Sequence, residues 1–357
     1  MNNHVSLAMV LQRINELGLR YEILEIGEGL CVVVLERGAR IFGPFESPDS
    51  ESILWMNSMW LDQGTFKNKI EEGEFDLGGE RFWIEPEFAF FTKEKKRFHE
   101  TYIVQASLDP GHYKLEKKQS RIRLFNTVNC EVFELPIKEK SFTIEKEIRS
   151  LPNPLRYVRG LQSLIQDVKY GGYEISATVV DTSPQNEIPL GPWFIAQINP
   201  GGHVFMPING EFEYVDFYEP ITEEYQTFQD GYIKLKITGD HRFKPGYRSA
   251  QTIGRLAYLN ETDKGETYAI VRNYFNDPSQ DYCAEPFEDL GNFGCSVYFY
   301  NDTGKLGGFA ELENAGIPID GKSGKTQGTS TIDEWFFIGQ KDHVTQIVNT
   351  LLGTSIR

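Results

Sequence analysis

The sequence has few of the features that mark disulfide-rich, zinc-binding or nucleic-acid-binding proteins. Only four cysteines occur in 357 residues, at Cys31, Cys130, Cys283 and Cys295, and no two of them form a C-x-x-C pair. This scatter indicates neither a disulfide framework nor a zinc site. Basic residues are outnumbered by acidic ones, 36 against 52, and the formal net charge of -16 disfavours nucleic acids and anionic membranes as partners.

Long apolar runs and common catalytic motifs are also missing. No apolar stretch reaches the length of a membrane span, and the N-terminus lacks the basic-then-apolar pattern of a secretory signal. We therefore expect a cytoplasmic protein with no membrane partner. The G-x-S-x-G and H-E-x-x-H motifs are absent from the sequence. We expect neither a cofactor nor a metal ion.

What the sequence does contain is enough apolar material for a sizeable core. Apolar residues make up 40% of the chain and aromatic residues 13%, so disorder is excluded as a general description. A chain of 357 residues is long enough for two ordinary domains or for one large all-β domain.

The residue pattern favours the all-β alternative. Alternating segments such as Arg121 to Leu124 and Tyr232 to Ile237 recur at short spacing, without helices between them. Helical spacing is confined to Val5 to Leu17, Asn153 to Val168 and Lys341 to Leu352. This distribution predicts a large antiparallel β-sandwich rather than a parallel α/β sheet.

The chain has no Ser- or Pro-rich linker and no clear internal repeat. We therefore predict one β-sandwich domain over residues 21–357, preceded by a helical appendage at residues 1–20.

The most informative stretch lies near the end of the chain, from Gly307 to Pro318. It is predicted to form a strand that buries Phe309 and Leu312 and ends in a glycine-proline turn. Because strand side chains alternate, Glu311 and Glu313 share one face. A carboxylate at such a strand end is well placed to act as a base. The alternative is an edge strand with solvated glutamates.

The same stretch resembles the Leu-Glu-x-x-Gly-Phe-Pro segment of the galactose mutarotase (aldose 1-epimerase) family. Leu312-Glu313 matches the Leu-Glu pair, and Gly316-Ile317-Pro318 matches Gly-Phe-Pro. The resemblance implies a β-supersandwich fold. It also implies that Glu313 removes the proton from the anomeric hydroxyl of a sugar.

A second segment, Gly78 to Glu87, has the residue types of a sugar pocket. Its paired glycines allow close backbone approach, Arg81 offers hydrogen-bond donors, and Trp83 offers a flat stacking surface. In the family that it resembles, a Gly-Arg segment supplies a sugar-contacting arginine, which implies binding roles for Arg81, Trp83 and Glu85. The alternative is a structural arginine paired with Glu85 or Glu87.

Three further positions follow from the resemblance. The Asp-His-x-Phe pattern that begins at Asp240 is similar to a family segment whose aspartate binds a sugar hydroxyl. Trp193 stands near the position of the catalytic histidine in the family and is expected to wall the pocket. His203, which follows a glycine turn, is the best substitute for the acid that protonates the ring oxygen.

The sequence therefore predicts a sugar-binding aldose 1-epimerase that acts by acid/base catalysis. A sugar-binding protein without activity is the second interpretation, because the family histidines are unmatched. The third is a glycoside hydrolase or lyase on the same fold, with carboxylates such as Glu85 and Glu313 as a pair. The expected ligand is a monosaccharide or short oligosaccharide, and the expected state is a monomer or homodimer.

Overall fold

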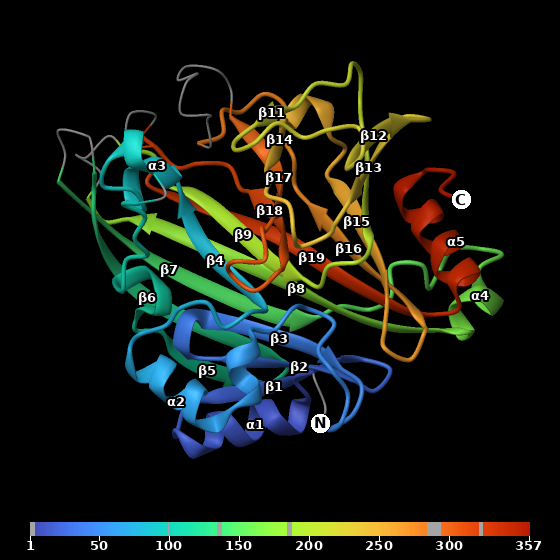
Figure 1. Ribbon diagram of the computed structural model, residues 1–357, viewed down its shortest axis with the longest axis horizontal. Helices are drawn as coiled ribbons and strands as arrows, with labels where there is room; N and C mark the ends of the chain where they lie inside the picture. Colours follow the sequence, from blue (N-terminus) through green and yellow to red (C-terminus); the bar gives the residue numbers. More distant parts are fainter. Residues whose placement is uncertain (1–3, 99, 134–137, 184–187, 284–293, 321–323) are drawn as a thin grey trace.

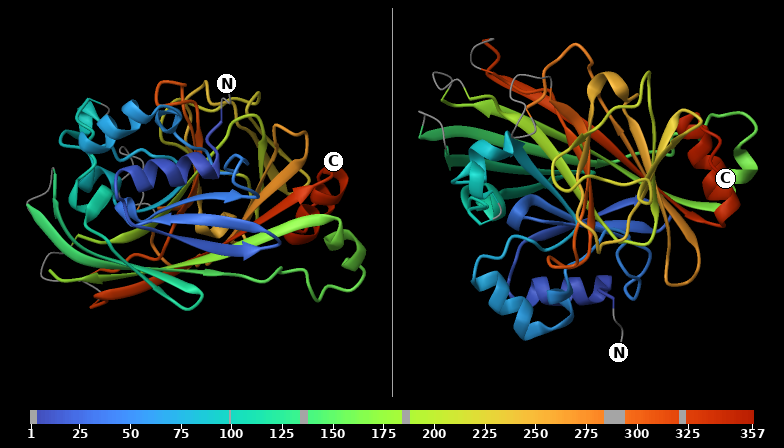
Figure 2. Two further views of the ribbon diagram at one scale, coloured as in Figure 1. Left: turned by 90° about the horizontal axis from the view of Figure 1, so that it is seen from below. Right: turned by 45° about the horizontal axis from the view of Figure 1, so that its top comes forward.

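The protein is a sandwich of two large antiparallel sheets, as a computed structural model shows (Figures 1 and 2). The structure describes residues 4–98, 100–133, 138–183, 188–283, 294–320 and 324–357. The all-β sandwich predicted from the sequence is confirmed.

Within the described residues, the first sheet contains nine strands. Their spatial order is β1 (Tyr21–Gly27), β2 (Leu30–Leu35), β3 (Arg40–Phe45), β4 (Glu80–Glu85), β9 (Gly191–Ile198), β18 (Ala310–Ala315), β17 (Cys295–Asn301), β14 (Pro245–Arg248) and β11 (Val215–Asp216). β4, β9 and β18 are neighbours, although they are far apart in the sequence.

The second sheet contains ten strands within the same described ranges. Their order is β12 (Gln226–Gln229), β13 (Tyr232–Lys236), β10 (His203–Pro207), β15 (Arg255–Glu261), β16 (Thr267–Tyr274), β19 (Gln327–Gly339), β8 (Val168–Asp181), β7 (Glu139–Ser150), β6 (Arg121–Glu131) and β5 (Lys114–Lys118).

Period-two alternation explains how these strands build one core. β6 alternates strictly between exposed and buried residues along its whole length, because one face meets the opposite sheet. The main core cluster takes side chains such as Phe194 and Leu312 from the first sheet and Ile270 and Phe336 from the second. The layer between the sheets is therefore apolar along most of its extent.

The N-terminal helix predicted at Val5 to Leu17 is present as α1 (Leu7–Glu16). Ser6 caps it by accepting a hydrogen bond from the backbone N–H of Met9. Together with α2 (Gln63–Glu71), α1 covers the outer side of β2 and β3 through a separate apolar cluster (Figure 1). The division into an appendage and one domain at residue 21 stays a prediction.

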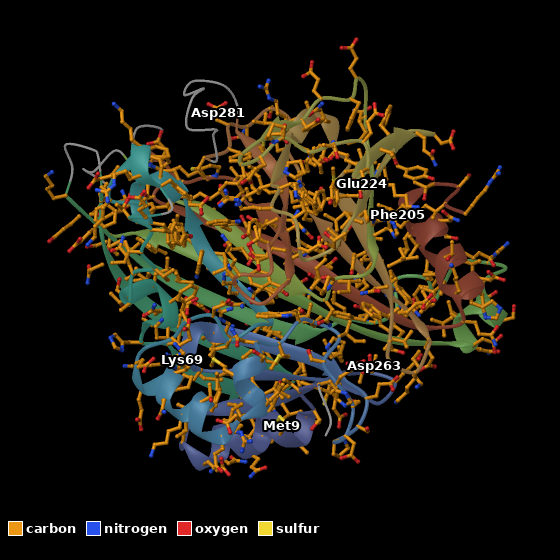
Figure 3. The ribbon with its side chains drawn as sticks, in the orientation of Figure 1. Met9, Lys69, Phe205, Glu224, Asp263 and Asp281 are labelled. Atoms are coloured by element: carbon orange, nitrogen blue, oxygen red, sulfur yellow. The ribbon has the colours of Figure 1, made fainter. Side chains whose placement is uncertain are left out.

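At the other end, α5 (Lys341–Leu352) is confirmed with the predicted bounds and packs on the outer side of the ten-stranded sheet. Figure 3 shows Phe205 of β10 on the side of α5. The long helix predicted at Asn153 to Val168 is wrong, because only α4 (Gln162–Gln166) forms there. Gly160 has a positive φ of 84°, which breaks the helical run, and Asn153 caps a turn instead.

The remaining helix of regular type is the short α3 (Glu87–Phe90), which follows β4. None of the helices in the described part of the chain has the length and apolar character needed to cross a bilayer.

Candidate functional site

Glu311 and Glu313 lie on the outer face of β18, which is turned away from the ten-stranded sheet. Leu312 between them joins the inter-sheet core, so the two glutamates point to the opposite side, as the sequence predicts. β18 is hydrogen-bonded to β9 on one side and to β17 on the other, and Glu313 is 0% exposed. The alternative of an edge strand with solvated glutamates is therefore wrong.

The Glu313 carboxylate is held by one of its two oxygens. Its Oε2 accepts a hydrogen bond from the indole Nε1 of Trp193 at 2.9 Å and lies 3.0 Å from the Nζ of Lys244. Its Oε1 is buried and has no hydrogen-bond partner among the described residues. A carboxylate oriented through one oxygen keeps the other available for a proton or a ligand hydroxyl.

Charge at this point is balanced between a carboxylate and an ammonium group. Burial raises the pKa of Glu313 to about 7, and the nearby Lys244 only partly opposes this rise. Burial disfavours the charged form of Lys244, but the carboxylates of Glu313 and Glu87 raise its pKa above the ordinary value. Glu313 therefore changes its protonation state near neutral pH while Lys244 stays charged.

Arg81 reaches the same face from β4. The backbone register places Arg81 opposite Ile195 of β9, which in turn lies opposite Glu313 of β18. The Nη2 of Arg81 is 2.7 Å from Oε1 of Glu311, and its Nη1 is 4.0 Å from Asp76. Arg81 is thus paired, but with Glu311 and Asp76 rather than with Glu85 or Glu87.

The two tryptophans form a wall beside these charges. The rings of Trp83 and Trp193 meet edge to face at a centroid distance of 5.7 Å, and the Arg81 guanidinium lies 4.3 Å from the Trp83 ring. The indole Nε1 of Trp83 donates to Asp109 at 2.9 Å. The Trp83 ring is therefore held in place, and its indole N–H is already engaged in a hydrogen bond with Asp109.

Glu85, the third predicted residue of β4, is also buried on this face at 1% exposure. Its Oε2 has no hydrogen-bond partner within the described ranges. Burial raises the pKa of Glu85 well above its ordinary value, and the charge of Glu313 acts in the same direction. Glu85 therefore carries a proton at pH values where an exposed glutamate is ionised.

The structure does not bring His203 to this face. His203 belongs to β10 of the ten-stranded sheet, and its ring contacts Phe205, which packs in the outer cluster with α5. Its neighbours Val204 and Met206 point into the inter-sheet core instead. His203 is thus on the far side of the other sheet and does not join Glu313.

Asp240 is exposed in the turn after β13. Lys244, four residues later, lies 3.0 Å from the Glu313 carboxylate. The binding role of Asp240 stays a prediction, and the residue of this segment that contacts Glu313 is Lys244.

Sequence reasoning missed Lys244 and Asp76. Lys244 directly follows the Asp-His-x-Phe pattern that begins at Asp240, and this position after a family-like pattern is the signal that was available. Asp76 is half-buried beside Arg81 and accepts a hydrogen bond from Gln197 at 3.0 Å. No local motif marks Asp76.

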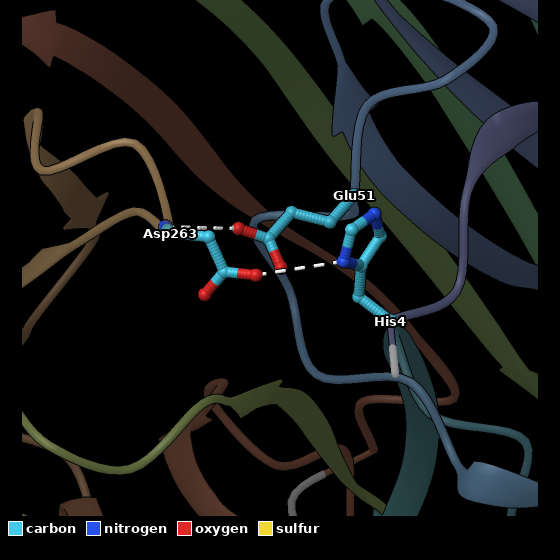
Figure 4. Close-up of side chains that lie close together, drawn as sticks. All are labelled: His4, Glu51 and Asp263. Atoms are coloured by element: carbon cyan, nitrogen blue, oxygen red, sulfur yellow. Dashed lines mark hydrogen bonds and ion pairs between the residues drawn. The ribbon is translucent and has the colours of Figure 1, made fainter. Parts of the chain in front are cut away.

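One group of described residues has the spacing of metal ligands. The ligand atoms of His4, Glu51 and Asp263 lie within 4.8 Å of one another (Figure 4). His4 is 3.5 Å from the Asp263 carboxylate, and Glu51 accepts a hydrogen bond from the Asp263 backbone N–H at 3.3 Å. These mutual contacts account for the group without an ion, and it lies outside the Glu313 face.

A phosphate-loop pattern, G-x-x-x-x-G-K-S, fits residues 316–323. A functional phosphate loop joins a strand to a helix, whose N-terminus binds the phosphate. Here the next element is the strand β19, and residues 321–323 lie outside the described residues. The pattern is therefore not part of the candidate site.

The chain belongs to the family described as "Family of unknown function (DUF6786)", which matches residues 24–357. No curated protein matches the sequence significantly.

Two solved structures are similar in arrangement. The first, from Klebsiella pneumoniae, is proposed by its name to be an aldose 1-epimerase; it is 10% identical, with a TM-score of 0.42, and the match covers 91% of this chain and 80% of that one. The second is the 4-alpha-glucanotransferase of Thermococcus litoralis, at 10% identity and a TM-score of 0.33, with 92% of this chain and 40% of that one covered. Neither likeness bears on activity.

Proposed function

We propose that the chain binds a monosaccharide or short oligosaccharide on the Glu313 face and interconverts its anomers as an aldose 1-epimerase. The observation that supports this most is the arrangement of the Glu313 carboxylate. Its Oε2 contacts Trp193 and Lys244, and its Oε1 has no hydrogen-bond partner among the described residues. A base needs this combination of fixed orientation and a free lone pair.

In this proposal Glu313 takes the proton from the anomeric hydroxyl through Oε1. The ring C–O bond then breaks, and the ring oxygen receives a proton from an acid, for which we propose Glu85 in place of the family histidine. Two carboxyl groups with separately raised pKa values suit a base and an acid. Rotation about the open carbonyl carbon and the reverse steps give the other anomer.

Recognition of the sugar rests on Arg81 and the tryptophan wall. The Nε and Nη1 atoms of Arg81 are buried and make no hydrogen bond to any described residue, and the proposal assigns these donors to sugar hydroxyls. Trp83 and Trp193 supply apolar surface next to these donors. Carboxylates are numerous here, which favours a neutral sugar over a phosphorylated or carboxylated one.

The test is anomer exchange measured by polarimetry or NMR on D-galactose, D-glucose and other common aldoses. We expect exchange faster than in buffer for at least one sugar, and loss of that acceleration in Glu313→Gln. If the wild-type protein binds a sugar without accelerating exchange, the epimerase proposal is wrong and the binding interpretation replaces it.

Hydrolysis of a glycosidic bond is a second candidate function, because Glu85 and Glu313 are two buried carboxyl groups on the same sheet face. A panel of chromogenic glycosides distinguishes it. Release of the chromophore that Glu85→Gln abolishes would favour the hydrolase over the epimerase.

A further inference from the structure

A hollow lies on the other side of β18 from Glu313, between the two sheets. It has a volume of about 250 Å³, and its walls include Phe194 and Asn314 of the first sheet and Tyr274, Ser330 and Ile332 of the second. The outer face of β18 carries Glu313, and the next residue, Asn314, points to the opposite side. One strand thus separates this hollow from the proposed sugar site.

Asn314 is the unusual residue of the hollow. It is 1% exposed, and neither its Nδ2 nor its Oδ1 has a hydrogen-bond partner among the described residues. A buried polar group without a hydrogen-bond partner destabilises the fold. A side-chain amide in this setting calls for an occupant that both accepts and donates a hydrogen bond.

The remaining walls limit the chemistry of that occupant. No charged side chain lines the hollow within the described residues, so neither an anion nor a cation finds a counter-charge there. Phe194, Tyr274 and Ile332 supply apolar surface, and the exposed Phe275 stands at the edge. The lining therefore favours a neutral molecule with one apolar side and one polar edge.

The size of the hollow exceeds what one water molecule fills. A single buried water needs only about 10–15 Å³ on the same measure, against about 250 Å³ here. Water near the apolar walls would also lack the polar partners that ordered water normally has.

We propose that this inter-sheet hollow is a second binding site, which takes a small neutral ring compound with adjacent hydroxyl groups and holds it through the Asn314 amide. One hydroxyl accepts a hydrogen bond from Nδ2, and its neighbour donates one to Oδ1. The ring lies against Phe194 and Tyr274. This site is independent of proton transfer at Glu313.

The test uses trans-1,2-cyclohexanediol, which carries the adjacent hydroxyl pair on an apolar ring but has no anomeric centre. The full-length protein is labelled with ¹⁵N-asparagine, and the Asn314 side-chain NH₂ signal is identified by its absence from Asn314→Leu. We expect this signal to shift saturably with the diol. Cyclohexanol, which can make only one of the two hydrogen bonds, should bind about fivefold more weakly.

Two variants decide whether the binding is at this site. Saturable diol binding, measured by calorimetry, should be lost in Asn314→Leu and also in Ile332→Phe, which fills the hollow from the opposite sheet and leaves the amide in place. It should persist in Glu313→Gln. An unmoved Asn314 signal in the wild-type protein, or binding that Glu313→Gln abolishes, would overturn the proposal. Failure of the epimerase proposal alone leaves these results unchanged.

Discussion

Two clusters of buried charge lie close together and differ in what they connect. The inter-sheet cluster consists of Arg272 on β16, Glu80 on β4, Glu334 on β19 and Tyr173 on β8. The Glu313 cluster consists of Glu313, Lys244, Arg81, Glu311 and Asp76, and it lies on the outer face of the nine-stranded sheet.

In the inter-sheet cluster the charges join strands of the two facing sheets. Arg272 is 0% exposed, pairs with Glu80 and Glu334, and donates to the backbone carbonyl of Leu312 on β18. Tyr173 donates to the other oxygen of Glu80 at 2.8 Å. These contacts fix the position of one sheet on the other.

In the Glu313 cluster, four carboxylates share two cationic groups once Glu87, 3.8 Å from Lys244, is included, and Oε1 of Glu313 has no hydrogen-bond partner in the described residues. Burial of charge alone therefore does not mark a functional site. Each cluster keeps a buried carboxylate oxygen without a hydrogen-bond partner among the described residues, Oε1 of Glu313 in one and Oε2 of Glu334 in the other. The difference is that the inter-sheet charges tie the two sheets together, whereas the Glu313 cluster lies on one face of a single sheet, beside Trp83 and Trp193.

The largest effect is expected from breaking the inter-sheet cluster. Arg272→Met leaves Glu80 and Glu334 buried without their cation, and should lower the free energy of unfolding by about 3–5 kcal/mol. Urea denaturation measures the loss. Arg149→Met removes a partly exposed partner of Glu174 and should cost at most about 1 kcal/mol. Equal losses in the two variants would contradict the structural role of Arg272.

The next effect is on rate. Glu313→Gln removes the proposed base and should lower the rate of anomer exchange by about 10²–10⁴-fold. It also leaves the buried Lys244 without its nearest carboxylate, so the free energy of unfolding should fall as well, and the rate is compared where urea denaturation shows the variant to be folded. Glu80→Gln should lower stability and leave the rate of the folded protein unchanged. Glu311 is not a silent control, because it is the ion-pair partner of Arg81, and Glu311→Gln is expected to weaken sugar binding.

Local features of the sequence predicted those parts of the fold that depend on local structure. α1 and α5 have apolar stripes with helical spacing, and both form as predicted. The segment after Asn153 has the same spacing, but Gly160 adopts a positive φ and the helix shortens to five residues. The helical spacing of apolar residues predicts which face of a helix would be buried, but it does not ensure that the backbone stays helical.

The sequence pointed to residues of the candidate site only where a single segment contains a recognisable motif. Glu313 and Arg81 stand in glycine-bounded motifs, and both reach one face. The partner of Arg81, Glu311, is 230 residues away in the sequence and meets it only because β4, β9 and β18 are neighbours. That strand order arises from tertiary pairing, so neither this ion pair nor the one between Lys244 and Glu313 is visible in the sequence.

The pH dependence of the anomer exchange rate tests Glu313 of the Glu313 cluster as the base. The base must be ionised, and burial raises the pKa of Glu313 to about 7, so the rate should rise with pH through about 7. It should fall again at the higher pH where Glu85, the proposed acid with a raised pKa, loses its proton. Glu313→Gln should remove the rising limb from the residual rate. A profile that is flat between pH 5 and 9 in the wild-type protein would contradict Glu313 as the base.

A smaller effect is expected on binding. A bound monosaccharide should change the tryptophan fluorescence, because Trp83 and Trp193 lie beside Arg81 and Glu313. Arg81→Ala removes the unpartnered donors and should abolish this change at sugar concentrations that saturate the wild-type protein. An undiminished change in Arg81→Ala would place the sugar elsewhere.

The smallest effect is expected at His203, the acid that the sequence favours. Burial, together with the positive charges of Lys234, Lys236 and Lys341, lowers the pKa of His203 to about 4, so the ring is neutral at pH 7 and has no proton to give as an imidazolium acid. It also lies on the other sheet. His203→Ala should therefore leave the rate of anomer exchange unchanged, and Asp240→Asn, a surface change, should move stability by no more than about 0.5 kcal/mol. Polarimetry checks the rate in His203→Ala, and urea denaturation checks the stability of Asp240→Asn. If His203→Ala lowered the exchange rate as far as Glu313→Gln does, the catalytic groups would lie on the ten-stranded sheet. The proposed site at the Glu313 cluster would then be wrong.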